Sequence, residues 1–154
     1  MKIKSLCITL FLFGSIFLLQ AAEDVNLLIA VDSSEFKTEL SQQILDLADA
    51  ESYNVTVWES VKTIQGRDLG EFDAVIAINR ATVGRMNRKL IKVLEEGRYP
   101  SMVIVTSYGD PETSKDDYSA YNAVDGITTA SLKNSSEIKD LAQEIFSRVQ
   151  ELLK

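Results

Sequence analysis

Apolar residues gather in three short, nearly continuous runs along the chain. These runs lie at residues 25–31, 72–78 and 102–105. Strands of a parallel sheet that is covered by helices on both faces have this composition, because neither side of the strand meets water. The three runs therefore predict three central strands of a parallel sheet.

The segment 53–58 has a different pattern, because apolar and polar residues alternate along it. One face of the segment carries Tyr53, Val55 and Val57. Alternation of this kind is typical of a strand with one exposed face, so we expect 53–58 at an edge of the sheet. A fifth strand is expected around 124–128, after a polar loop at 107–122.

Three segments between the strands carry apolar residues at intervals of three and four, which is the spacing of one face of an α-helix. The apolar positions are Phe36, Leu40, Ile44, Leu47 and Ala48 in the first segment, Met86, Leu90, Val93 and Leu94 in the second, and Ile138, Leu141, Ala142, Ile145, Val149 and Leu152 in the third. Asn134, with Glu137 three residues later, is expected to cap the third helix. The interval 59–71 has room only for a short helix, around 61–64 or 68–69. Strands and helices that alternate in this way predict an α/β, doubly wound fold with right-handed crossovers.

Residues 72–86 resemble the third strand and the following loop of flavodoxins. The family pattern is Tyr-Asp, three apolar residues, Gly-Ser-Pro, an aromatic residue and Gly-Arg-Met, or close to it. This chain is in step with that pattern at Phe72, Asp73, Gly84, Arg85 and Met86. The resemblance implies a flavodoxin-like sheet of five parallel strands in the order 2-1-3-4-5, with 53–58 at an edge.

In a sheet of this order, ligands bind at the carboxyl ends of the strands, where the strand order reverses. Flavodoxins hold FMN there between three loops, and the resemblance assigns a set of candidate contacts to the same loops of this chain. The candidates are Ser33, Ser34 and Thr38 for the phosphate, Asn79, Arg80, Thr82 and Gly84 beside the flavin ring, and Tyr108, Gly109 and Tyr118 on its outer face.

The same loops depart from the family at positions that contact the flavin. Phe36 replaces a glycine of the phosphate loop, and Asp32 and Glu35 place carboxylates beside the phosphate dianion, where like charges repel. Thr82 stands where flavodoxins often have an aromatic residue that stacks on the ring. FMN is therefore a candidate cofactor that we expect to bind weakly at best.

Several candidates have alternative, purely structural roles. Ser33 or Ser34 can cap the first helix, and the tyrosines can pin their loop to the sheet. Residues 124–131 also resemble the signature of exported proteins that carry FMN as a phosphoester, with Ser131 at the acceptor position. The same residues fit an ordinary fifth strand, which is the interpretation that we favour.

Composition narrows the possible chemistry. The chain has no histidine, and its single cysteine lies near the start, which excludes Cys/His metal sites and Ser-His or Cys-His hydrolases. Asp32, Asp110 and Asp117 are the remaining candidates for a metal site or an acid-base pair, although acidic loop residues usually face solvent. The sequence therefore favours a non-enzymatic binding or accessory module, with an FMN electron carrier as the alternative.

Residues 1–22 have the features of a secretory signal peptide. A start that contains Lys2 and Lys4 precedes an apolar run at 6–19, and two alanines end the segment. This run is short for a membrane span, which needs roughly 20 residues, so an uncleaved anchor is the alternative. We expect an exported, periplasmic or extracellular flavodoxin-like domain at 23–154.

Charge limits the partners of such a domain. The formal net charge is −7, and loss of Lys2 and Lys4 with the signal peptide takes it to −9. This acidity disfavours nucleic acid and anionic lipid as partners, and a basic protein partner fits it better.

The first prediction is cleavage near Ala22, because a charged start, an apolar core and small residues follow one another in the order that signal peptidase recognises. Mass spectrometry of the exported protein is expected to give a mature chain that begins close to Glu23. A membrane-bound chain that still begins at Met1 would contradict this prediction.

Overall fold

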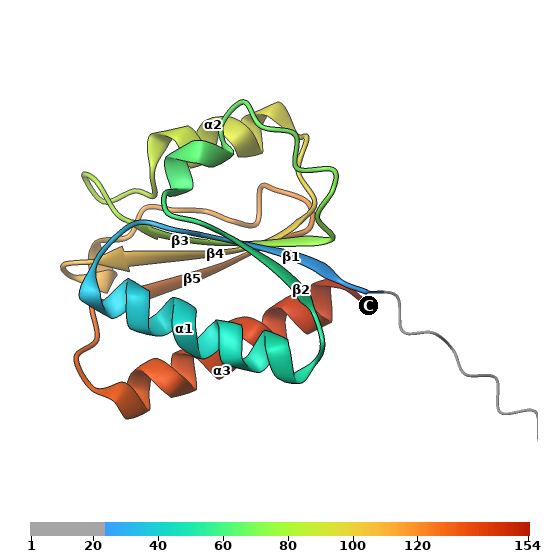
Figure 1. Ribbon diagram of the computed structural model, residues 1–154. Coiled ribbons are helices and arrows are strands. Elements are labelled where there is room, and N and C mark those ends of the chain that lie inside the picture. Colours follow the sequence, from blue (N-terminus) through green and yellow to red (C-terminus); the bar gives the residue numbers. More distant parts are fainter. Residues whose placement is uncertain (1–23) are drawn as a thin grey trace, which may run out of the picture.

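The computed structural model of the protein describes residues 24–154, and the predicted signal peptide lies outside the described residues. Five strands form one parallel sheet in the order β2-β1-β3-β4-β5 (Figure 1). The strands are β1 (Asn26–Val31), β2 (Asn54–Trp58), β3 (Ala74–Arg80), β4 (Ser101–Tyr108) and β5 (Val124–Ala130). The predicted fold class and strand order are confirmed, with β1, β3 and β4 central and β2 at an edge.

Helices cover both faces of the sheet, as Figure 1 shows. One face carries two long helices, and the other carries a shorter helix and a 3₁₀ turn. The elements are α1 (Glu35–Ala50) and α3 (Ser135–Leu152) on the first face, and α2 (Arg88–Glu96) and η1 (Val61–Ile64) on the second. The short helix expected within 59–71 is therefore η1. Within residues 24–154, no helix combines the length and the apolar character needed to cross a membrane.

The two faces of the central strands build two separate cores, because successive side chains of a strand point in opposite directions. In β1, Leu27 and Ile29 enter the core shared with α1 and α3. Leu28 and Ala30 enter the core shared with α2 and η1. All four side chains are fully buried, which explains why β1 appears in the sequence as a continuous apolar run.

The edge strand β2 differs in one respect from the sequence pattern. Tyr53 and Val55 pack against the core of α1 and α3, but Val57 on the same face is 43% exposed. The opposite face contributes instead, because Trp58 packs edge-on against Phe72 with ring centroids 5.9 Å apart. Tyr53, just before β2, and Trp58, at its end, are therefore half-buried on opposite faces of the sheet.

Two helices are capped by the residues that the sequence predicts. The Ser34 hydroxyl accepts a hydrogen bond from the backbone N–H of Lys37 at 3.3 Å and caps α1. The Asn134 side chain caps α3 by accepting from the N–H of Ser136 at 2.9 Å. Both bonds satisfy N–H groups that have no partner within their helix, so both predicted caps are confirmed.

A loop, rather than a long helix, connects the parallel strands β4 and β5. Residues 109–123 contain a single 3₁₀ turn, η2 (Pro111–Thr113), and Tyr118 and Tyr121 of this loop pack on the same core as α2. The loop thus covers the part of the sheet next to β5 on the α2 side. Its hydrogen bonds determine the shape of the candidate site.

The second prediction concerns Ile76, which is fully buried in the centre of β3. Replacing Ile76 by Asp is expected to unfold the domain, because burying an unpaired carboxylate costs several kcal/mol, against a typical total stability of about 5–15 kcal/mol. Urea unfolding followed by circular dichroism measures the effect. Thr128→Asp, at an exposed position of the edge strand β5, is the matched control and should unfold nearly as the parent does. Native stability in the Ile76→Asp variant would contradict the role of Ile76 in the core.

Candidate functional site

The carboxyl ends of β1, β3 and β4 form the crevice at which the strand order reverses. Backbone hydrogen bonds hold the strand ends together: Asp32 N–H donates to the Ile78 carbonyl at 3.0 Å, and Ala81 N–H donates to the Ser107 carbonyl at 2.9 Å. Three loops leave this edge, at 32–34, 81–87 and 109–123. Ligands of doubly wound sheets bind in this region.

The first loop is compact and uses its polar groups to begin α1. The Ser34 hydroxyl is occupied as the helix cap, and the Ser34 carbonyl accepts the N–H of Thr38 at 2.9 Å. Phe36 is 6% exposed and belongs to the core of α1 and α3. Ser33 is exposed, and Thr38 is an exposed residue of α1. The structural alternative for Ser34, capping of α1, is the one that the structure bears out.

The sequence pattern predicts the Asp32 carboxylate beside the bound phosphate, but in the structure this carboxylate is engaged elsewhere. Its carboxylate accepts hydrogen bonds from the N–H of Val61 at 3.1 Å and from the hydroxyl of Ser60 at 3.3 Å. These bonds satisfy the start of η1, which needs an acceptor for its first N–H groups. Asp32 therefore joins the end of β1 to the turn that follows β2.

Lys37 is the residue of this loop whose environment the sequence does not reveal. It is only 3% exposed, and burial lowers the pKa of its ammonium group, with the nearby charge of Asp32 opposing this shift and that of Arg80 adding to it. Within residues 24–154, the Lys37 ammonium has no hydrogen bond or ion pair. Two cations, Lys37 and the exposed Arg80, thus lie near the start of α1.

Asn79 and Arg80 are the last residues of β3, whereas the sequence placed them in the following loop. The reason is that β4 is longer than its apolar run and pairs Thr106 and Ser107 with them. The Asn79 amide is fully buried, donates to the Val105 carbonyl and to the Thr106 hydroxyl at 3.0 Å each, and accepts from a backbone N–H at 2.9 Å. Asn79 therefore bridges β3, β4 and the start of α2. Its predicted contact with a flavin ring stays a prediction.

Asp116 is the centre of a hydrogen-bond network that the sequence analysis missed. Its carboxylate accepts from the backbone N–H of Met86, at 2.9 and 3.1 Å for its two oxygens, and from the hydroxyl of Tyr108. The hydroxyl of Tyr118 lies 3.4 Å from the same carboxylate and 3.0 Å from the hydroxyl of Thr106. The network ties the β4–β5 loop to the start of α2 and to β4.

The ring of Tyr118 lies directly on β5. A Cβ atom at Gly126 would be 2.0 Å from the nearest Tyr118 ring atom, so only glycine allows this approach. Tyr108 is 3% exposed. Both tyrosines predicted to flank a flavin are therefore packed against the sheet, as expected for residues that pin their loop. Their contact with a flavin stays a prediction.

The remaining candidates lie in exposed parts of the loops. Thr82 and Arg85 close a tight turn, in which Gly84 has a positive φ of 74° and accepts a hydrogen bond at its carbonyl from the N–H of Lys115 at 2.9 Å. Gly109 is exposed and begins the β4–β5 loop. Neither glycine position alone points to a flavin.

Comparison with solved structures identifies the architecture. The chain is similar to the flavodiiron protein of Giardia intestinalis, with a TM-score of 0.59, 15% sequence identity and coverage of 83% of this chain. It is also similar to a flavodiiron core of Synechocystis sp. PCC6803, with a TM-score of 0.62, 17% identity and 86% coverage. Flavodoxin 1 of Bacillus cereus matches with a TM-score of 0.53, 10% identity and 82% coverage. The chain has the flavodoxin-like fold.

The extent of these matches differs between the two groups of proteins. The chain spans 37% of each flavodiiron protein and 97% of the Bacillus flavodoxin. No protein-family model matches the sequence, and no curated protein matches it significantly. At such low identity the similarity establishes the fold, and the function has to be argued from the site.

The three candidate acids lie apart in their contacts. Asp32 contacts the start of η1, Asp110 caps η2, and Asp117 accepts hydrogen bonds from Ser119, which lower the pKa of Asp117. Among residues 24–154, no three residues of the metal-binding types come together.

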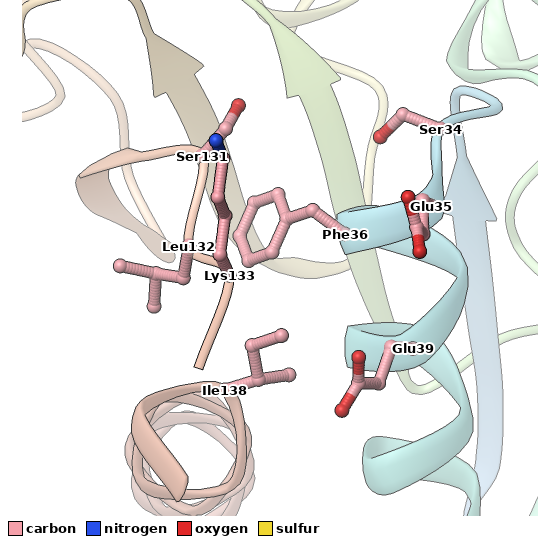
Figure 2. A pocket seen from close by; sticks show the side chains of 8 residues that line it. All are labelled: Ser34, Glu35, Phe36, Glu39, Ser131, Leu132, Lys133 and Ile138. Carbon is pink, nitrogen blue, oxygen red and sulfur yellow. The ribbon is translucent and has the colours of Figure 1, made fainter. Parts of the chain in front are cut away.

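A cavity of about 390 Å³ lies beside the crevice, between the starts of α1 and α3. Figure 2 shows Glu35 and Glu39 on the α1 side and Lys133 on the other, with the Phe36 ring directed toward Ser131. Two carboxylates against one ammonium make this cavity a poor match for a phosphate. Ser131 follows β5, so the interpretation of 124–131 as the fifth strand is the better one.

The third prediction concerns pH. Burial and the hydrogen bond to Asp116 raise the pKa of Tyr108 to about 12, and burial also raises the pKa of Tyr118. An unfolded tyrosine ionises near pH 10, so the unfolded chain loses its phenolic protons first. The stability from this source is complete below about pH 10 and is lost between about pH 10 and 12, with about 3 kcal/mol for two pKa units.

Urea unfolding of the parent and of Tyr108→Phe, at intervals from pH 7 to 12, measures this loss. The variant should be less stable at pH 7, by about 1–3 kcal/mol for a lost bond to a buried carboxylate, but should decline less steeply above pH 10. Tyr53→Phe is the control, because Tyr53 packs on Phe146 through its ring. Equal alkaline slopes for all three proteins would contradict the prediction.

Proposed function

We propose that the protein is a non-enzymatic binding domain, in which the protein's own side chains fill the flavodoxin crevice and FMN does not bind tightly. The observation that carries the proposal is the engagement of both candidate stacking residues. The hydroxyls of Tyr108 and Tyr118 point to Asp116, and the Tyr118 ring covers Gly126. Releasing either ring toward a ligand would leave buried hydrogen-bonding groups unpaired, at a cost of about 1–3 kcal/mol each.

The start of α1 supports the same conclusion. A phosphate loop has to present several backbone N–H groups to a dianion, which glycine permits because it lacks a side chain. Here Phe36 fills a core position, and the Ser34 hydroxyl already accepts a hydrogen bond. Glu35 adds negative charge at about 1 kcal/mol or more at close range. The charge of Glu35 alone is expected to weaken phosphate binding roughly fivefold, at 1.4 kcal/mol for each factor of ten, and the loss of the phosphate-loop hydrogen bonds weakens it further.

The alternative function is an FMN electron carrier, and two observations favour it. A flavodoxin of Fusobacterium nucleatum with the same fold binds flavin mononucleotide. Lys37 and Arg80 also supply positive charge near the start of α1. In this alternative, the hydroxyls of Ser33 and Thr38 and the two cations hold the phosphate, and the Asp116 network opens to admit the ring.

The composition of residues 1–22 supports an exported location for either function. An exported binding module requires a partner protein, and the acidic net charge is compatible with a basic one. Its action would then consist of association rather than chemistry.

The fourth prediction separates the two functions by titrating the mature protein with FMN while recording flavin fluorescence. No saturable quenching is expected at submicromolar FMN. Tyr108 and Tyr118 are bonded to Asp116, and the Ser34 hydroxyl already caps α1. Thr38→Ala is expected to leave the titration unchanged, since Thr38 is an exposed helix residue. Tight quenching that both Thr38→Ala and Lys37→Met weaken would establish the electron carrier instead.

A further inference from the structure

A hollow of about 590 Å³ lies on the α2 side of the molecule, on the loops at 81–87 and 109–123 that also border the crevice. Its lining includes Thr82, one of the candidate flavin contacts. It is formed by the tight turn after β3, the first residues of α2 and the β4–β5 loop. Its lining includes Val83, Arg85, Met86, Arg88, Ile91 and Lys115. We call it the α2 hollow. Met86 is buried and Ile91 is half-buried, so the hollow has an apolar floor.

The rim of the α2 hollow is strongly basic. Arg85, Arg88 and Lys115 are exposed, and none of them forms an ion pair with any residue in 24–154. The lining contains no carboxylate. In a chain with a formal net charge of −7, this is a local reversal of sign. A ligand with negative charge around an apolar group complements the hollow.

The charges of α2 reinforce the reversal. The first turn carries Arg88 and Lys89 and no acidic residue, while Glu95 and Glu96 end the helix. Cations at a helix N-terminus and anions at its C-terminus both oppose the helix dipole, so this arrangement lowers the stability of the helix. The same arrangement adds the positive end of the dipole to the charges around the hollow.

Val83 is an exposed apolar side chain at the edge of the hollow. It is 90% exposed and adopts a φ of +55° in the turn closed by Thr82 and Arg85. A β-branched residue rarely adopts this conformation, which glycine or asparagine accepts without strain. Valine thus places an apolar group in solvent at a position where glycine would give a more stable turn.

We propose that the α2 hollow docks an acidic segment of a partner protein. An apolar side chain of the segment enters against Met86, Ile91 and Val83, and carboxylates on either side pair with the three cations of the rim. Nucleic acid fits less well, because the lining offers no aromatic ring for base stacking.

The proposal rests on the binding function proposed above and refines its partner, because the segment that enters the hollow is acidic. The FMN titration measures flavin binding, and the experiment below measures peptide binding. Their outcomes are therefore distinguishable.

The fifth prediction uses the full mature chain and a fluorescein-labelled synthetic peptide of eight residues. The peptide has a central Phe-Leu pair with three Asp or Glu residues on each side. Fluorescence anisotropy should give saturable binding that weakens as salt is raised. The double variant Arg85→Glu, Arg88→Glu is expected to bind at least about tenfold more weakly, because it replaces attraction by repulsion at the rim. Val83→Gly should weaken binding severalfold without lowering the Tm, since glycine suits the turn.

The matched control is Lys133→Glu, Lys139→Glu, which makes the same change in net charge at exposed positions near or on α3. It should bind the peptide nearly as the parent does. Equal weakening by this control, or equal binding of a peptide with Ser-Ser in place of Phe-Leu, would overturn the proposal. So would tighter binding of a DNA oligonucleotide or anionic vesicles, or self-association that the Arg85→Glu, Arg88→Glu variant abolishes, because the occupant would then belong to another class.

Discussion

One carboxylate, that of Asp116, ties the β4–β5 loop to the start of α2 and to β4. The connection from β4 to β5 has no long helix to shape it, so residues 109–123 depend on their own hydrogen bonds. Asp116 accepts from the Met86 backbone and from Tyr108, with the Tyr118 hydroxyl at 3.4 Å. A half-buried carboxylate that loses these donors lowers the free energy of unfolding. The contacts around Asp116 therefore depend on one another. Release of Tyr108 or Tyr118 from the sheet would therefore disrupt the whole network.

The network also explains the positions of residues around it. Thr106 bonds both Tyr118 and Asn79, and Asn79 accepts from the backbone N–H of Asn87, the cap of α2. The chain of hydrogen bonds therefore runs from the β4–β5 loop through β4 and β3 to the start of α2. Chains of this kind make the ends of strands rigid, because no single hydrogen bond can break without leaving buried groups unpaired.

The sequence predicted the fold well and the site poorly, for a physical reason. Central strands are covered by apolar surface on both faces, so their sequences are continuous apolar runs such as 72–78, and these runs can be recognised without knowledge of the structure. Hydrogen-bond partners in loops are chosen by three-dimensional proximity, which neighbouring residues do not encode. Asp116 and Asp117 are adjacent and identical in type, yet one organises the loop and the other only binds Ser119. The left-handed conformation of Val83 is equally invisible in the sequence, since valine normally avoids it.

The hydrogen bonds of Asp116 also restrict the loops after β3 and β4. To admit a flavin ring, the loops after β3 and β4 would have to move apart, and the outer surfaces of these loops would move with them. Here the Met86 backbone is bound to Asp116, and the Lys115 backbone is bound to Gly84. The two loops that form the α2 hollow are therefore joined to each other. A rigid surface loses less entropy when a partner binds, so these hydrogen bonds favour the docking that we propose for the hollow.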